Sequence, residues 1–223
     1  MKKLLALMLS AVLMVSLVAC GSDGAATRDD GESNTSGGSD SMTKEEMLEA
    51  AETTEEVEMN NALVENIVNA KQTYCGKVFE VTAPVYIIEE NYIFVGQNGR
   101  SLIVYLPEED IINLQPSQWI TVVGLTNDDI QTEIQVMGGT EWERQYFVME
   151  QAYLVTDRYD YTGIPTSEND SYTGAWNVEF PGQSVQKVVY FDESIDVSQY
   201  VGEEITFTAQ CIDGKYYNAT MTQ

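Results

Sequence analysis

Acidic side chains are the groups in this sequence with the greatest capacity for chemistry. The 223-residue chain contains 36 Asp and Glu, 11 Lys and Arg, and no His. Without His there is no Ser-His-Asp or Cys-His catalysis, no His-liganded zinc and no imidazole general base. Enzymatic activity would therefore need a pair of carboxylates. Two clusters are candidates for such a pair: Glu108-Glu109-Asp110, and Asp128-Asp129 with Glu133.

Neither acidic cluster has a spacing that specifies a reaction. The first follows Pro107, and acidic residues are favoured in the first turn of a helix. The second, Asp128, Asp129 and Glu133, offers the oxygen ligands that calcium prefers but lacks the regular spacing of a calcium loop. We therefore expect solvated charge at both clusters, no cofactor and no enzymatic activity. A hydrolase that uses a pair of these carboxylates is the third hypothesis, behind two non-catalytic binding functions.

The first twenty residues predict export. Two lysines precede an apolar run over residues 4–18, a pattern typical of a secretory signal and too short for a permanent membrane span. The ending Leu17-Val18-Ala19-Cys20 resembles the lipobox of bacterial lipoproteins. That resemblance implies removal of residues 1–19, lipidation of Cys20, and anchoring to the cell membrane on the side facing away from the cytoplasm. The alternative is an ordinary secretory signal with a chance Cys at the cleavage point.

Residues 21–42 predict a flexible tether after the lipidated Cys20. They are mostly Gly, Ser, Asp and Thr, which bury too little apolar surface to offset the entropy lost on ordering. Loss of Lys2 and Lys3 with the signal would take the formal net charge from −25 to −27. This negative charge argues against a nucleic-acid partner, because phosphate binding needs Lys and Arg. The same charge suits binding of cations or of a basic partner.

Two further cysteines, Cys75 and Cys211, leave the question of a disulfide open. An exported location permits such a bond. Their spacing matches no disulfide framework, however, and two separate buried thiols fit the sequence equally well.

A helical pattern runs from the capping box Thr43-Lys44-Glu45-Glu46 to about Gln72. It is either continuous or interrupted at Thr53 and Thr54, which would give one short acidic helix and then the amphipathic one. Apolar residues recur in it at spacings of three and four, which predicts an amphipathic helix packed on a sheet. The predicted apolar stripe consists of Leu63, Val64, Ile67, Val68 and Ala70.

From Lys77 onward the apolar period changes to two, which predicts strands. Pro84 interrupts the first run and suggests a bulge or a bend, and Asn98-Gly99 is a strong hairpin signal. A short helical segment is expected at 107–114, and a long loop with room for a minor hairpin at 126–146. The expected strands are 78–83, 92–95, 101–106, 119–125 and 147–155. This is the element order of a five-stranded OB barrel.

Residues from about 60 to 156 resemble the tRNA_anti-like OB-fold domain found in many bacterial lipoproteins. The resemblance is carried by Tyr74 and Gly76, by Glu80-Val81-Thr82, and by the segment Ile120 to Gly124. The chain departs from the family pattern at Ala83, where Gly is expected, and in the long loop. The resemblance implies a barrel; it implies no demonstrated RNA binding.

The segment YVGEEITFTA at 200–209 repeats several residue types of YCGKVFEVTA at 74–83. Residues 172–223 therefore read as the later strands of a reduced OB-like repeat, or the similarity arises by chance because strands share residue types. We expect a mainly β protein: an N-terminal amphipathic helix on a five-stranded OB-like barrel, then a smaller C-terminal β unit. The expected divisions are a signal at 1–19, lipidated Cys and linker at 20–42, helix and barrel at 43–157, and linker and C-terminal unit at 158–223.

The candidate ligand face of this barrel consists of Tyr92, Phe94, Tyr105 and Arg100. Tyr92 and Phe94 share one side of their strand, and outward-facing rings would stack on a base or a sugar. We expect inward-facing rings that belong to the core, because aromatic residues at strand positions usually pack inside a small barrel. We expect a non-catalytic binding or interaction module that contacts an envelope protein, a peptide or a glycan. Capture of an oligosaccharide or nucleic acid on the barrel face is the alternative.

Overall fold

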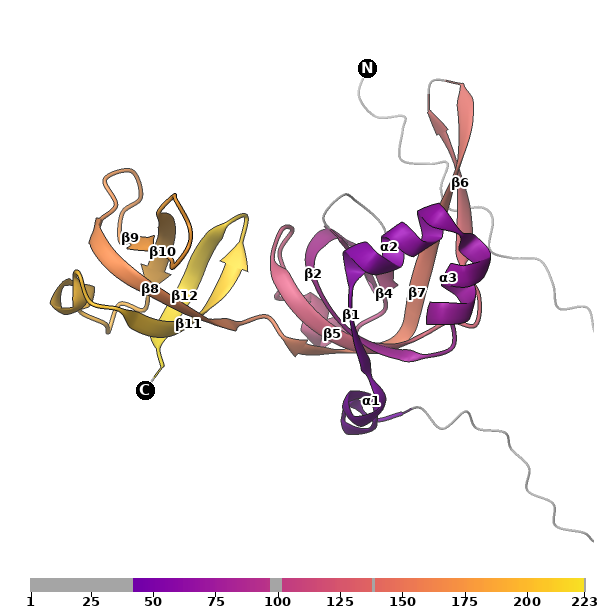
Figure 1. The fold of residues 1–223 in the computed structure, drawn as a ribbon, viewed down its shortest axis with the longest axis horizontal. Helices are drawn as coiled ribbons and strands as arrows, with labels where there is room; N and C mark the ends of the chain where they lie inside the picture. The colour runs from indigo at the N-terminus through magenta and orange to yellow at the C-terminus, as the bar shows by residue number, and fades with distance from the viewer. Residues whose placement is uncertain (1–41, 97–101, 138, 223) are drawn as a thin grey trace, which may run out of the picture. The chain divides into compact units, whose positions relative to one another are not determined.

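The computed structural model describes residues 42–96, 102–137 and 139–222. The predicted signal, the lipidation site Cys20, most of the tether, the turn Asn98-Gly99 and Arg100 lie outside the described residues. Within the described ranges, no helix is long and apolar enough to span a membrane. The described chain is mainly β, with two closed five-stranded barrels (Figure 1).

The first barrel closes through antiparallel pairs and one parallel pair. Its strands are β2 (Val78–Ile88), β3 (Ile93–Val95), β4 (Leu102–Val104), β5 (Trp119–Thr126) and β7 (Thr140–Thr156). They follow the order β2-β3-β4-β7-β5, and β5 pairs back onto β2. The parallel pair joins β4 to β7, and α4 (Glu108–Ile111) lies between β4 and β5 in the chain. Strand β1 (Glu52–Glu55) is added parallel to the first half of β2.

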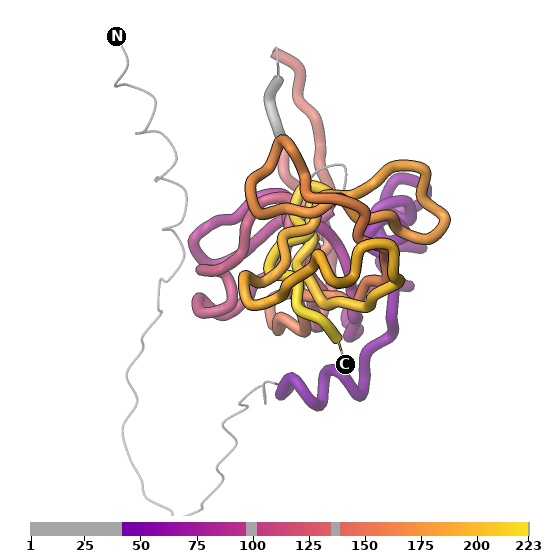
Figure 2. The backbone as a smooth tube through the Cα atoms, turned by 90° about the vertical axis from the view of Figure 1, so that its left-hand side faces the viewer, coloured from indigo at the N-terminus to yellow at the C-terminus, as the bar shows by residue number. Residues whose placement is uncertain are grey.

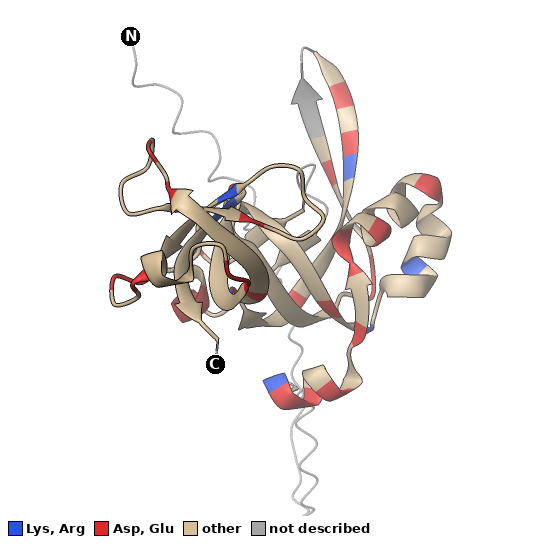
Figure 3. Cartoon of the chain, turned by 60° about the vertical axis from the view of Figure 1, so that its left-hand side comes forward, with Lys and Arg blue, Asp and Glu red and all other residues tan. Residues whose placement is uncertain are grey.

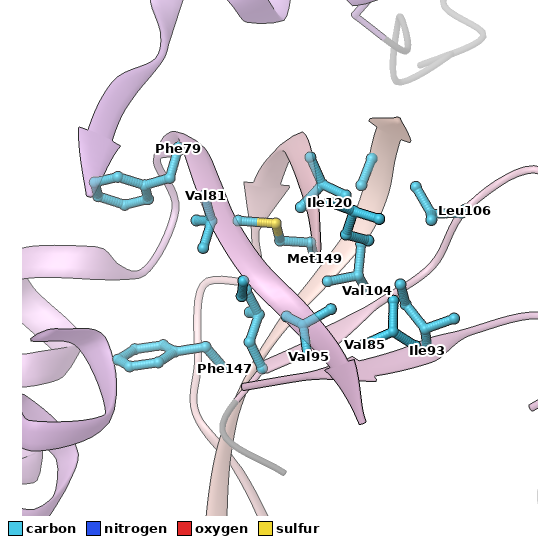
Figure 4. Close-up of a cluster of buried hydrophobic side chains, with 14 of the residues drawn as sticks. Phe79, Val81, Val85, Ile93, Val95, Val104, Leu106, Ile120, Phe147 and Met149 are labelled. Carbon is cyan, nitrogen blue, oxygen red and sulfur yellow. The ribbon is translucent and has the colours of Figure 1, made fainter. Parts of the chain in front are cut away.

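Alternate residues of β2 point into one apolar core, as the period of two predicts. Phe79, Val81 and Val85 are buried there with Phe147 and Met149 of β7 (Figure 4). Burial of such side chains stabilises the barrel by about 1.5–3 kcal/mol each. The predicted irregularity at Pro84 is confirmed one residue later, because the register between β2 and β3 shifts between Val85 and Ile87.

Three helices precede the first barrel: α1 (Lys44–Ala50), α2 (Glu56–Glu65) and α3 (Ile67–Tyr74). The capping box at Thr43 and Glu46 is present in both directions. The single apolar stripe is wrong, because Asn66 ends α2 and caps α3 by accepting hydrogen bonds from the amides of Val68 and Asn69. The break divides the stripe: Leu63 and Ala70 join the core, whereas Val64 is 81% exposed and Val68 is also exposed.

The second barrel is complete. It contains β8 (Tyr159–Glu168), β9 (Trp176–Glu179), β10 (Lys187–Phe191), β11 (Ile205–Ile212) and β12 (Lys215–Met221), with the short helix η1 (Val197–Tyr200) before β11. Its closed order is β10-β12-β11-β8-β9. Each barrel therefore has its first strand between the second and the fourth, and its third strand parallel to the fifth.

The prediction of a linker followed by a reduced unit is wrong for residues 159–168, which form β8, the first strand of the second barrel. Gly163 and Pro165 are residue types that usually mark a break between strands. A Cβ on Gly163 would lie 2.5 Å from Cγ1 of Val178, so glycine permits close pairing of β8 with β9. Pro165 lies at a register shift of the same pair.

The expected long loop at 126–146 is mostly a β-hairpin. Strand β6 (Gln131–Met137) pairs with the first seven residues of β7, from Gln131 opposite Tyr146 to Met137 opposite Thr140. We call residues 131–137 and 139–146 the ribbon. It projects away from the first barrel, as Figures 1 and 2 show from two directions.

Candidate binding surfaces

Four aromatic rings form a continuous row on the outside of the first barrel. The ring centroids of Tyr105 and Tyr92 lie 5.3 Å apart, those of Tyr92 and Phe94 5.6 Å, and those of Phe94 and Tyr146 6.1 Å. Phe94 lies between Ile93 and Val95, which belong to the core, so its own side chain leaves the opposite face of β3. We call this set the aromatic row.

The aromatic row is exposed at one end. Phe94 is only 8% exposed, whereas Tyr105 is 36% exposed and Tyr92 is half-buried. Phe94 and the buried Tyr146 therefore support the two outer tyrosines. Of the predicted ligand face, the structure brings Tyr92, Phe94 and Tyr105 together, and Arg100 lies outside the described residues.

Sequence reasoning missed Tyr146 because the expected fifth strand began one residue later. Its place at the start of a run in which Phe147 and Met149 face the core would have assigned it to the outer face. The Tyr146 hydroxyl donates a hydrogen bond of 2.9 Å to the Glu133 carboxylate, so the aromatic row also reaches the base of the ribbon.

The acidic residues singled out in the sequence take up separate roles. Asp129 pairs with Lys71 at 2.9 Å, and that interaction is the main cause of its lowered pKa. Glu133 accepts the bond from Tyr146, while Glu108 to Asp110 form the start of α4. Within the described ranges, no three His, Cys, Asp or Glu side chains are grouped as metal ligands. Of the three predicted calcium candidates, Asp129 and Glu133 therefore bond other side chains. The three do not form one metal centre among the described residues.

The ribbon carries two large exposed apolar side chains, Ile134 at 61% and Trp142 at 59% exposure. The register places Ile134 opposite Glu143, so Trp142, one residue away, leaves the other face of the ribbon. No third strand of the described chain pairs with residues 131–146. A two-stranded ribbon is at most marginally stable alone, and exposed apolar groups with open strand edges are typical of interaction sites.

A pocket of about 290 Å³ lies where β1 and α2 meet β2 and β5. It is lined by the apolar residues Val57, Ala83, Pro84 and Trp119, and by Glu55, Glu56 and Thr82, which supply its polar groups. The Thr82 hydroxyl is 2.8 Å from that of Thr121. The pocket is partly open, and its lining is too mixed to specify a ligand.

Both cysteines that remain after Cys20 are free thiols in the structure, Cys75 half-buried and Cys211 buried. Burial is the largest cause of the raised pKa of each thiol. A raised thiol pKa lowers the thiolate fraction, so neither thiol is activated as a nucleophile.

Positive charge is scarce over the described chain, as Figure 3 shows. Two of the cations are occupied by backbone oxygens: Lys44 donates to the carbonyl of Leu154, and Arg158 to those of Thr208 and Asn218.

A scan against protein-family models found no match, and a search of curated proteins found no match. The roles of the ribbon and the aromatic row therefore rest on their geometry.

Proposed function

We propose that the mature protein is a lipid-anchored envelope protein that acts as a non-catalytic binding module, with the ribbon as its docking surface for a partner protein. The proposal of a lipid anchor rests on the lipobox-like ending at Cys20. The Gly- and Ser-rich residues 21–42 would act as a flexible tether that lets the folded domain reach away from the membrane.

We propose further that both barrels are OB-like. In each, the third strand pairs with the fifth in parallel and a short helix precedes the fourth strand, an arrangement that fits a five-stranded OB barrel. It supports, for residues 60–156, the relationship to tRNA_anti-like domains. The second barrel would then be a second unit of the same kind, which supports duplication over chance similarity.

The observation that carries the proposed function is the exposure of Trp142 on a strand pair with open edges. Trp is among the residues that dominate binding energy at protein interfaces, because its large apolar surface fills a pocket on the partner. The partner should be neutral or basic, since Glu133, Glu141 and Glu143 outnumber Arg144 on the ribbon and the whole chain is strongly acidic.

The experiment is in-cell crosslinking of the tagged, full-length protein, followed by affinity measurements with the captured partner. Trp142→Ala should weaken the complex roughly 30-fold or more, which corresponds to the loss of a central aromatic anchor. Tyr86→Ala, which removes an exposed ring from β2 instead, should leave the affinity unchanged. Equal affinities for both variants would contradict the assignment of the ribbon.

A second candidate function is oligosaccharide capture on the aromatic row, supported by the exposure of Tyr105 beside Tyr92. Nucleic acid is less suited, because its phosphates would meet a strongly acidic protein. On a column carrying a glycan that retains the wild-type protein, Tyr105→Ala should abolish retention. Retention of the variant would contradict this second candidate. A carboxylate-dependent hydrolase has less support, since residues 108–110 form the start of α4 while Asp129 and Glu133 bond Lys71 and Tyr146.

A further inference from the structure

Four side chains of the second barrel gather on one patch of its outer surface. Tyr190 of β10 and Tyr217 of β12 stack with centroids 4.8 Å apart and planes inclined by 6°. Lys215, at the start of β12, holds its Nζ 4.3 Å from the ring centroid of Tyr172, which lies between β8 and β9. We call Tyr172, Tyr190, Lys215 and Tyr217 the Tyr–Lys patch.

The Tyr–Lys patch faces solvent. Val189 and Tyr216 belong to the second core, so Tyr190 and Tyr217, their neighbours along the strands, leave the opposite face. None of the four side chains is buried, and Tyr172 is 39% exposed. The pKa of Lys215 is raised, first by its hydrogen bond with Tyr172 and further by Tyr217 and Tyr190. Lys215 and Tyr217 are two residues apart on β12 and therefore leave the same face of the strand.

Lys215 forms no ion pair with a carboxylate, as is true of every described cation except Lys71. The single ion pair between described residues joins Lys71 and Asp129, although the chain has more than three acidic residues for each basic one. The Lys215 ammonium is therefore a positive charge without a carboxylate partner, held over the ring of Tyr172. Such a charge has hydrogen-bonding capacity left for an anionic group from outside the chain.

Aromatic rings and one cation together select a narrow class of ligand. Tyr rings offer flat apolar faces for a sugar ring and hydroxyls for its polar edge. The single Lys can bind one carboxylate, whereas a nucleic acid would need several cations and would be repelled by the acidic chain. We propose that the Tyr–Lys patch binds an oligosaccharide that carries carboxylate groups, with a sugar ring against the tyrosines and a carboxylate at Lys215.

This site is separate from the ribbon and from the aromatic row, so the proposal does not rest on the proposed function. The other role open to these rings is purely structural, because stacked cross-strand tyrosines also stabilise a sheet. A structural role predicts an effect of substitution on unfolding and none on binding. A binding role predicts an effect of Lys215 that depends on the charge of the sugar.

The experiment is calorimetric titration of the purified full-length protein with tetragalacturonate, using maltotetraose as the uncharged comparison. We expect saturable binding of tetragalacturonate that Tyr217→Ala and Lys215→Gln each weaken by about tenfold or more. Lys215→Arg should retain binding, because it keeps the charge. Tyr86→Ala, which removes an exposed ring from the first barrel, should leave the affinity unchanged.

Three results would overturn the proposal. The first is the absence of saturable binding of tetragalacturonate, and the second is equal affinity of the wild type and Lys215→Gln, a variant that removes the positive charge. The third is equal affinity for the charged and the uncharged oligomer. If Tyr217→Ala lowers the melting temperature while Lys215→Gln and Tyr217→Ala both bind normally, the stack is structural and the site assignment is wrong.

Discussion

Gly163 gives a direct test of how the second barrel closes. Its backbone contacts β9 so closely that an added Cβ would lie 2.5 Å from Cγ1 of Val178 and 3.0 Å from the carbonyl oxygen of Glu179. The second contact cannot relax by a side-chain rotation, because Glu179 pairs with Ile164 in the β8–β9 ladder. Gly163→Ala should therefore push the two strands apart.

The size of this effect follows from two opposing contributions. Overpacking a well-packed site costs about 1–3 kcal/mol, and two close contacts place Gly163→Ala near the upper end. Replacing Gly with Ala also restricts the unfolded chain, which stabilises the folded state by about 0.5–1 kcal/mol. We expect a net loss of about 2 kcal/mol in the free energy of unfolding, or a fall of about 1 M in the urea midpoint.

Urea unfolding of the full-length chain, followed by circular dichroism and Trp fluorescence, measures this loss. The matched variant is the double substitution Gly163→Ala with Val178→Ala, which removes the methyl group that the new Cβ meets. Its destabilisation should be smaller than the sum of the single effects by about 1 kcal/mol. A urea midpoint of Gly163→Ala equal to that of the wild type would refute the argument from close strand pairing.

Three other predictions concern the first barrel and the thiols. Thr126→Val should destabilise the fold by about 1–3 kcal/mol in urea unfolding, because the buried hydroxyl satisfies backbone groups between α3 and β2. A loss below the error of the measurement would contradict that role. Lys71→Gln should raise the NMR-titrated pKa of Asp129 back toward its ordinary value. Since that pKa is lowered in the folded state, its contribution to stability is present above the ordinary pKa and is lost as pH falls through the lowered value. An unchanged pKa would exclude Lys71 as the cause. Cys75 and Cys211 should react with Ellman's reagent at neutral pH much more slowly in the native than in the urea-unfolded protein, and equal rates would show that burial does not protect them.

Strands with strong alternation were predictable because burial on one face leaves a period of two in the sequence. β2 shows this best, since Phe79, Val81 and Ala83 all enter the core. β8 was not predictable by the same reasoning. Gly163 and Pro165 are local signals for a break, and the close approach of β9 that requires glycine at 163 is a tertiary constraint.

The helical region shows a similar limit. The apolar spacing of Leu63, Val64, Ile67 and Val68 fits one continuous helix, but Asn66 offers its side chain as a cap and starts a new one. The cap changes the direction of the chain, so Val64 and Val68 lose contact with the core that Leu63 keeps.

The aromatic row was only partly predictable for a related reason. The sequence shows that Tyr92 and Phe94 share a side of their strand, but the choice between inside and outside depends on which neighbours fill the core. Ile93 and Val95 fill it, so the aromatic residues face outward. The ribbon was harder to predict, because its side chains at 131–134 and 140–143 are exposed and leave a weak periodic pattern.

The most direct test of the central claim places a photoreactive amino acid at position 134 of the ribbon and, in a second variant, at position 185 of the second barrel. Ile134 and Val185 are similarly exposed, so the two probes meet solvent equally. If the ribbon is the docking surface of a tethered binding module, irradiation of cells should yield one dominant protein adduct from position 134 and none of that adduct from position 185. The same adduct from both positions, or no protein adduct from position 134, would contradict the account.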